Sequence, residues 1–479
     1  AANGSPVKYN TGSLPPVNPL LSPRLGINWD VQGQHVTQIR GGTGLFSGRP
    51  AYVWISNQVG NTGVLTGFIQ QKNTTAYPFN PNPYAYAPPA SAITGAPASS
   101  FELALTDPNF KFPQVWRSNI AIDRKLPWLG LTAGAEFLYT KDVNGIAYEN
   151  VNLPAPDSSY VGYDNRPRWV NNATHPHANT IYTAVASDAT VLTNEGVGHS
   201  STLTFQLERP VTSGLYFKVG YSYGVSKNTV DPGSIAYGSW SANATPGDPN
   251  NPGVSYSANS AKNRVFAALT YSRNFFGLGN TAISLFLDGH NNGNTSYVYA
   301  GDMNGDGVRG NDLIWIPADT SQMNFVKDSL SPTAVYSRQQ QQAAFTAFIN
   351  QDSYLSSHRG QYAQKNAVFY PMLWRLDLSV AQDVGRAIMG QQNRIQIRLD
   401  ILNFTNMLNK SWGLGQVSTL PSAGTGVVAP LIFVGTDATG AATYKLENIG
   451  SNLITKSFQT TATTNDVWRL QLGVRYLLN

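Results

Sequence analysis

Residues 301–317, GDMNGDGVRGNDLIWIP, have the spacing in this chain that best suits metal chemistry. Carboxylate and amide oxygens stand at every second position before a glycine, as in the first half of a calcium-binding loop. The candidate ligands are Asp302, Asn304, Asp306, the backbone carbonyl of Val308, and Asp312. Such a loop uses a bidentate Glu at its twelfth position, which here is Leu313, so Asp312 or another loop must complete the oxygen shell. The sequence predicts either a structural Ca²⁺ ion or an ion-free turn of Asx and Gly residues.

Patterns that would indicate catalysis are missing from the sequence. There is no Gly-rich phosphate loop followed by Lys, no G-x-S-x-G motif and no His-x-x-x-His pair. His175 and His177 are the only closely spaced histidines, and such a pair in a polar segment is typical of solvated loop side chains. We therefore expect neither an enzyme nor a required cofactor.

Side chains suited to a polar ligand belong to strands of alternating polarity. In residues 394–404 one face carries charge and the other carries Ile and Leu, and residues 466–478 repeat the pattern with Trp, Leu, Val and Tyr on the apolar face. The polar positions that we expect to line an aqueous lumen are Arg394, Gln396, Arg398, Asp400, Arg469, Gln471 and Arg475. Such side chains commonly pair with one another, so we assign no substrate ligand.

The composition agrees with a barrel that has lipid outside and water inside. Charged residues are only 12% of the chain, about half the usual globular share, whereas aromatic residues make up 11%. Gly (44) and Tyr (24), with abundant Asn, Ser and Thr, supply neutral lining, aromatic belts and long polar loops. The net charge of +5, without clustered Lys and Arg, gives no reason to expect nucleic acid.

Strand-like segments recur in pairs along the chain, with short connections inside the pairs and segments of tens of residues between them. They are residues 24–31, 35–46, 115–124, 131–141, 201–208, 215–227, 264–274, 281–290, 373–383, 394–404 and 466–478. We expect roughly twelve to fourteen strands of about ten residues, the length that a tilted strand needs to cross a bilayer. Residues 47–113 read as one long polar loop, and residues 336–356 as a short amphipathic helix within another. This predicts an all-β fold: a partial antiparallel transmembrane β-barrel with long extracellular loops.

Several segments together resemble the TonB-dependent outer-membrane receptors, in the Oar-like branch whose N-terminus carries a carboxypeptidase-regulatory-like domain. They include LSPRLGINWDV, YVYAGDMNGDGVRGNDLIWIP, YLSSHRGQYAQKNA, RIQIRLDILNFTNMLNKSWG and the final WRLQLGVRYLLN. They are spread from Leu21 to Asn479, so the resemblance covers nearly the whole chain.

The resemblance implies a barrel of about 22 strands plugged by a globular domain, in the bacterial cell outer membrane. It implies uptake of a scarce substrate, such as a siderophore, an oligosaccharide or peptide material, with energy from TonB, ExbB and ExbD. The partners would then be outer-membrane lipid, these energising proteins and the substrate. We interpret residues 1–479 as the C-terminal part of the barrel, and expect the plug and the early strands to be absent. The chain ends on Asn479 instead of the family's usual aromatic residue, and Tyr476 is the nearest substitute.

Two other functions stay open. A porin-like passive channel would show the same strand signals, and is distinguished by conduction without energy. A β-rich surface adhesin would instead be soluble without detergent.

Overall fold

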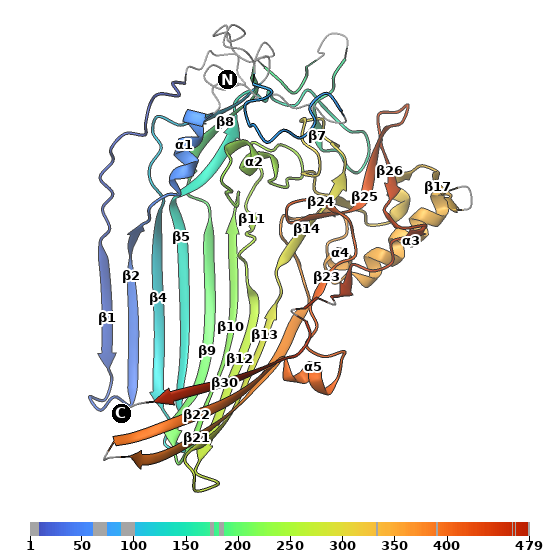
Figure 1. Cartoon of the computed structure of the whole chain (residues 1–479). Coiled ribbons are helices and arrows are strands. Elements are labelled where there is room, and N and C mark those ends of the chain that lie inside the picture. Colours follow the sequence, from blue (N-terminus) through green and yellow to red (C-terminus); the bar gives the residue numbers. More distant parts are fainter. Residues whose placement is uncertain are drawn as a thin grey trace.

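The computed structural model describes residues 9–60, 74–87, 101–172, 177–181, 186–331, 334–388, 391–461, 463–464 and 466–477. Its largest element is an antiparallel sheet in which successive strands lie side by side in chain order (Figure 1). These strands are β1 (Arg24–Asp30), β2 (Thr37–Ser47), β4 (Gln114–Lys125), β5 (Thr132–Asn150), β9 (His199–Thr212), β10 (Leu215–Asn228), β12 (Lys262–Arg273), β13 (Thr281–Asn291), β21 (Met372–Ile388), β22 (Gln391–Leu402) and β30 (Arg469–Leu477). Within the described strands, β1 and β30 each pair with one neighbour only, so the sheet has two open edges.

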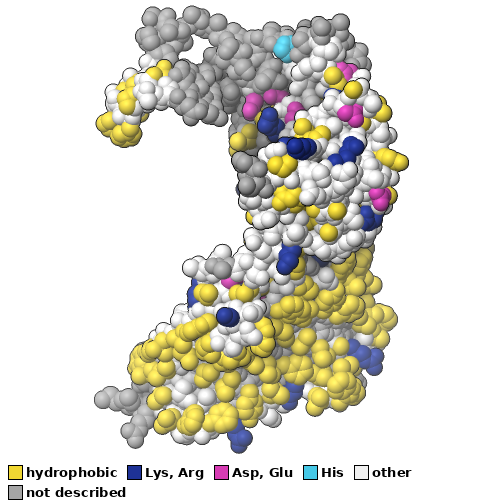
Figure 2. Space-filling view, turned by 90° about the vertical axis from the view of Figure 1, so that its right-hand side faces the viewer, with side chains coloured by type: hydrophobic (Ala, Val, Ile, Leu, Met, Phe, Trp, Pro, Cys, Tyr) yellow, Lys and Arg dark blue, Asp and Glu magenta, His cyan; other side chains and the backbone are white. Residues whose placement is uncertain are grey.

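The sheet has a polar face and an apolar face, because residues that pair across antiparallel strands point to the same side. The apolar face includes Leu25, Ile27, Ile120, Ile122, Phe205, Leu207, Val219, Leu285, Leu378, Ile395, Ile397, Leu470, Leu472 and Val474. Leu472 is 66% exposed and Val474 is 71% exposed. Figure 2 shows hydrophobic side chains covering the lower part of one side of the molecule. An exposed apolar surface of this extent belongs in contact with lipid.

Connections at one end of the sheet are short, whereas those at the other end are long. β9 and β10 are joined by Ser213 and Gly214 alone, and both have positive φ (53° and 79°), as a type I′ turn requires. A Cβ on Gly214 would collide with the backbone carbonyl of Ser272, so only glycine fits. At the opposite end, residues 229–261 connect β10 to β12 and residues 292–371 connect β13 to β21. This asymmetry is typical of outer-membrane barrels, whose long loops are extracellular.

The predicted strands are confirmed, and the whole sheet contains 14 strands. The strands beyond the main path are β3 (Phe101–Thr106), β8 (Ala186–Glu195) and β11 (Ser255–Tyr256). The expectation of one long loop over residues 47–113 was wrong. Helix α1 (Tyr52–Gly60) and strand β3 lie within it. Strand β3 could not be predicted locally, because its partner β8, with which it pairs in parallel, lies far along the chain.

Several long connections fold together beyond the strand ends. We call the described residues of 151–185, 229–261, 292–371 and 403–468 the cap. Its sheet consists of β16 (Asn324–Phe325), β26 (Ala442–Leu446), β25 (Val427–Thr436), β14 (Asn294–Ala300) and β20 (Val368–Phe369), with β24 (Ser422–Gly424) beside β25. The largest buried apolar cluster of the molecule joins this sheet to nearby helices, and includes Tyr297, Val298, Tyr299, Phe345, Phe348, Leu431, Tyr444 and Leu446. Figure 1 places these elements beyond one end of the large sheet.

The helix predicted for residues 336–356 is confirmed as two helices, α3 (Arg338–Gln351) and α4 (Ser353–Ser357). Ser337 caps the first through a capping box. Asp352 ends α3 and caps α4, because its carboxylate accepts the N–H groups of Tyr354 and Leu355, both at 2.9 Å. Phe345 and Phe348 point into the cap core, which explains the apolar spacing seen in the sequence.

The remaining elements are short. They are α2 (Ala236–Ser241), α5 (Phe404–Leu408), the 3₁₀ helix η2 (Thr320–Gln322), β6 (Ser158–Ser159), β7 (Pro167–Arg168), β15 (Trp315–Ile316), β17 (Asp328–Ser331), β18 (Ala334–Tyr336), β19 (Gln361–Tyr362), β23 (Gln416–Ser418), β27 (Asn448–Ile449), β28 (Asn452–Leu453) and β29 (Phe458–Thr460). Among the described residues, no helix has the length and apolar character needed to span a membrane.

Candidate functional site

The predicted lumen-lining residues all lie on the polar face, at one edge of the sheet. β22 pairs with β30 so that Gln396 stands opposite Arg475, and Asp400 stands opposite Gln471. Arg394, Arg398 and Arg469 fall on the same face, because the same alternation runs along both strands. The structure therefore brings these seven side chains onto one polar surface. Their contact with a lumen stays a prediction.

Several charged side chains of the polar face pair with one another. Arg398 Nε donates to Asp400 Oδ1 at 2.8 Å. Arg394 lies 3.2 Å from Asp383, which also accepts a hydrogen bond from Gln396 at 2.9 Å. Similar pairs are Arg40 with Asp123, Lys218 with Glu208, and Arg264 with Asp288. Each exposed pair contributes only roughly 0.2–1 kcal/mol. Arg469 and Arg475 form no ion pair with a described residue, so this edge of the wall keeps an excess of positive charge.

The cap contains a buried ionic cluster centred on Arg166, whose side chain has no exposed surface. Its guanidinium pairs with Asp164 at 2.9 Å and with Asp312 at 3.3 Å. Tyr299 and Tyr362 donate hydrogen bonds to the two oxygens of Asp164, at 3.1 and 3.0 Å, and both rings lie against the guanidinium. Burial alone would lower the pKa of Arg166, but the two carboxylates raise it above its ordinary value. The cluster joins segments far apart in sequence.

Asp312 connects this cluster to residues 302–308, which we call the acidic loop. Its Oδ1 faces Arg166, while its Oδ2 accepts hydrogen bonds from the backbone N–H groups of Met303 at 2.8 Å and Asn304 at 3.3 Å. Asp312 is fully buried. Its carboxylate is therefore committed to Arg166 and to the start of the loop.

The acidic loop folds through hydrogen bonds from its own backbone. Asp302 accepts the N–H groups of Gly305 at 2.8 Å and Gly307 at 3.0 Å. Asp306 accepts the N–H group of Val308 at 2.7 Å. These are turns closed by side-chain carboxylates.

Negative charge predominates around the acidic loop. Burial and the charges of Asp312 and Asp302 raise the pKa of Asp306, and burial likewise raises the pKa of Asp302 and of Asp312. Asn311 donates its amide to Asp306 at 2.9 Å, and its own Oδ1 is buried without a hydrogen-bond partner among the described residues. Among all the residues that the structure describes, no three Asp, Glu or His side chains form a group that could hold a metal. The calcium ion stays a prediction.

Sequence reasoning missed Arg166 and Lys365, which are buried cations among the described residues of the cap. Lys365 Nζ donates to the carbonyl of Thr229 at 2.9 Å and to Asn243 Oδ1 at 3.0 Å. Burial lowers the pKa of Lys365 to about 8, against the opposing charges of Asp231 and Glu195. No local pattern marks either cation, since Arg166 and Asp312 are 146 positions apart and Lys365 and Thr229 are 136 apart. Of the predicted histidine pair, His175 lies outside the described residues and His177 is exposed.

A model of the outer membrane beta barrel domain matches residues 2–427 of this chain. No curated protein matches the chain.

Solved structures of outer-membrane proteins resemble the chain at low sequence identity. The outer membrane transporter YddB from Escherichia coli matches with a TM-score of 0.40 and 11% identity, over 95% of this chain and 40% of its own. A mutant of the ferric enterobactin receptor PfeA from Pseudomonas aeruginosa matches with a TM-score of 0.39 and 8% identity, over 95% of this chain and 40% of its own. The FrpB iron transporter from Neisseria meningitidis matches with a TM-score of 0.34 and 11% identity, over 81% of this chain and 35% of its own. The chain thus spans about two fifths of the length of the first two proteins.

Proposed function

Since the chain belongs to the outer membrane beta barrel domain family, we propose that it forms part of the barrel of a TonB-dependent receptor. The protein lies in the bacterial cell outer membrane, where lipid covers the apolar face of the sheet. The two open edges and the strands in unbroken chain order support a larger barrel. Residues outside this chain would supply the remaining strands, the plug and the segment that contacts TonB.

The activity that we propose is uptake of a scarce substrate with energy passed by TonB, ExbB and ExbD. The observation that carries this proposal is the folded cap. A simple pore needs only loops that leave its entrance open, whereas this cap has its own sheet, helices and buried ionic cluster. A rigid surface beyond the strand ends is suited to hold a ligand before it enters the lumen.

The substrate class stays between a siderophore, an oligosaccharide and a peptide. Two similar structures are described as a ferric enterobactin receptor and an iron transporter, so chelated iron is the first class to test. The paired charges of the polar face add no preference among these classes.

A growth and uptake experiment tests the proposal. A strain lacking the gene is compared with a complemented strain on limiting iron chelates, oligosaccharides and peptides, each with and without functional TonB. We expect one class to be taken up only with both the gene and TonB present. Uptake that persists without TonB, with conductance of the purified protein in planar bilayers, would indicate a passive channel. Cell attachment without uptake of any class would indicate an adhesin.

We also propose that the acidic loop holds a structural Ca²⁺ ion through Asp302, Asn304, Asp306 and the carbonyl of Val308, with Asp312 behind them. The support is the excess of buried carboxylates, since neither Asp302 nor Asp306 forms an ion pair with a described residue. The test compares thermal unfolding in calcium, in magnesium and in EDTA. A rise in melting temperature with calcium alone, abolished in Asp306→Asn, is expected. Identical melting temperatures in all three would exclude the ion.

A further inference from the structure

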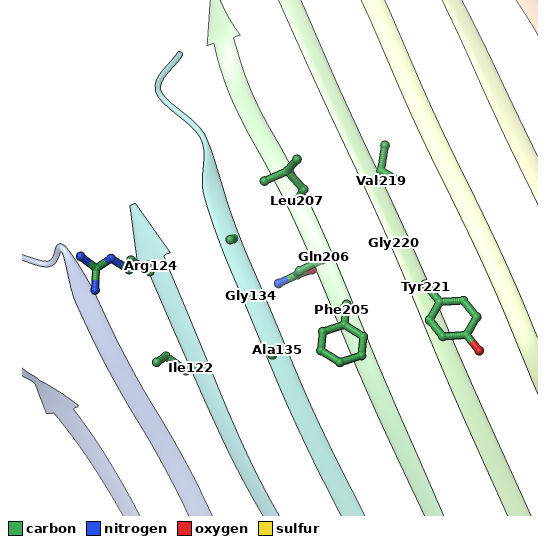
Figure 3. Close-up of a pocket in the computed structure, with 11 residues that line it drawn as sticks. Ile122, Arg124, Gly134, Ala135, Phe205, Gln206, Leu207, Val219, Gly220 and Tyr221 are labelled. Carbon is green, nitrogen blue, oxygen red and sulfur yellow. The ribbon is translucent and has the colours of Figure 1, made fainter. Parts of the chain in front are cut away.

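The apolar face contains a hollow of about 440 Å³, shown in Figure 3. This volume lies within the range of about 300 to 1,000 Å³ that ligand pockets usually have. Its floor is formed by Ala133 and Ala135 of β5, and its sides by larger residues of β4, β9 and β10. Most of the lipid-facing surface is filled by Ile, Leu, Val and aromatic side chains, so this stretch of small residues leaves a depression.

Strand register gives the hollow a direction. Ala135 stands between Ile122 and Phe205, and Ala133 stands between Arg124 and Leu207. The next residue of β5 on this face is Phe137, which is 43% exposed. Its aromatic ring fills the space above β5, so the hollow is closed at this end. In the other direction lie the short turns. The hollow therefore runs along β5 towards the turn end of the sheet, which is periplasmic in an outer-membrane barrel.

Positive charge without a matching negative charge stands at this open end. Arg124 is exposed, and none of the ion pairs between described residues includes it. Arg209, on the same face, is held at the turn end by the carbonyls of Leu129 and Leu215, at 3.1 and 2.8 Å. Between the turns and Lys141, the described apolar-face positions of β4, β5, β9 and β10 contain no Asp or Glu. The mouth of the hollow thus favours an anion.

We propose that this hollow binds one anionic phospholipid of the periplasmic leaflet. One acyl chain lies over Ala133 and Ala135, and the lipid phosphate pairs with the Arg124 guanidinium. Arginine is suited to this role, because its planar fork matches the oxygens of a phosphate and its long side chain reaches from an apolar surface to the headgroup level. The acyl chain supplies contact area, and the net negative charge of a headgroup without its own cation supplies the preference for an anionic lipid. Neither depends on which substrate the protein transports.

Native mass spectrometry of the protein isolated from outer membranes in mild detergent tests the proposal. Phosphatidylglycerol and phosphatidylcholine with identical acyl chains are titrated, and the lipids retained per protein are counted. Ala135→Leu fills the hollow, and Arg124→Gln removes the charge. Matched controls are Val380→Leu, on the apolar face of β21, and Arg273→Gln, at another turn end.

We expect one tightly retained phosphatidylglycerol in the unmodified protein and in both controls. Ala135→Leu should weaken its binding about tenfold, and Arg124→Gln should weaken it by a similar factor. Arg124→Gln should weaken the binding of phosphatidylcholine much less, because the choline cation of this lipid already offsets the charge of its phosphate. Equal retention in Ala135→Leu and in Val380→Leu would overturn the site in the hollow. Equal retention of the two lipids by the unmodified protein would overturn the preference for a headgroup with net negative charge.

Discussion

Individual buried charged residues hold the cap together, whereas the ion pairs of the membrane sheet do not have this role. Ion pairs of the polar face are partly exposed, and most join neighbouring strands that are already held by backbone hydrogen bonds. Arg166, in contrast, is enclosed and joins residues 164–166 to residues 312–313. Removing one partner of a buried ionic cluster costs far more than removing an exposed pair, because an uncompensated charge stays behind.

We predict that Arg166→Met destabilises the cap by roughly 3–5 kcal/mol, since Asp164 and Asp312 lose their cation. Limited proteolysis should show cleavage within residues 292–371, while the sheet keeps the shifted gel mobility of an unheated barrel. Arg168→Met is the matched control, because Arg168 is only half-buried and stacks on Tyr160. Resistance to protease equal to that of the control would contradict a stabilising role for Arg166.

Lys365 gives a prediction about pH. Its pKa of about 8 in the folded protein lies below the ordinary value of about 10.4, because burial outweighs the attraction of Asp231 and Glu195. Between these two pH values the unfolded chain binds more protons than the folded protein, so the free energy of unfolding rises with pH. Below about pH 8 this gain is absent, because Lys365 is then charged in both states.

The measurement is urea unfolding from pH 7.5 to 9.5 of the unmodified protein and of Lys365→Met. The free energy of unfolding should rise by roughly 1–2 kcal/mol more in the unmodified protein over this range, because a pKa difference of one corresponds to about 1.4 kcal/mol. The buried tyrosines titrate in both proteins and cancel in the difference. Parallel pH profiles would show that Lys365 is not perturbed by its surroundings.

The alternation of polar and apolar residues made the membrane strands predictable, but it could not reveal the strands of the cap sheet. A strand with lipid on one side and polar residues on the other carries period-two polarity, which the sequence shows directly in residues 394–404. β14 and β25 are instead buried on both sides, and β14 pairs in parallel with β25 across more than 100 residues. Such strands lack alternation and have no local turn to mark their pairing, so only their apolar content was visible.

Close packing between strands yields a prediction at the same scale. On the apolar face Gly289 pairs with Trp374, and a Cβ on Gly289 would collide with the indole ring. Gly289→Ala should displace Trp374 and destabilise the sheet by roughly 0.5–1.5 kcal/mol, through lost aromatic contact. Gly473→Ala is the control, since the nearest atom to its new Cβ is 3.9 Å away. Urea unfolding of both variants in lipid vesicles gives the comparison, and equal free energies would show that the ring adapts without cost.

For the whole molecule, the sequence predicted the fold class from repeated polarity, and the asymmetry of its connections predicts how the protein sits in the membrane. The long connections form the cap, which should face the outside of the cell, and the short turns should face the periplasm. The chain contains no cysteine, so single introduced cysteines can report on each region without background labelling.

We predict that Val161→Cys, in the cap, reacts with a membrane-impermeant maleimide on intact cells. Phe276→Cys, in the turn between β12 and β13, should react only after the outer membrane is permeabilised. Both side chains are exposed, at 58% and 69%, so a difference in labelling reports their side of the membrane and not their burial. The reversed result would mean that the cap faces the periplasm and the short turns face the outside of the cell. Equal labelling on intact cells would place both ends in the same compartment.

Leu472→Cys completes the experiment, because Leu472 is as exposed as these two residues in the absence of lipid. We expect it to stay unlabelled on intact and on permeabilised cells, and to react once the protein is unfolded in detergent. A thiol in hydrocarbon is neither ionised nor reached by a polar reagent, so protection would come from lipid covering the apolar face. Rapid labelling of Leu472→Cys in permeabilised cells would mean that water reaches this face and that β30 does not contact lipid. Three positions of similar exposure thus separate outside, periplasm and hydrocarbon in one protein.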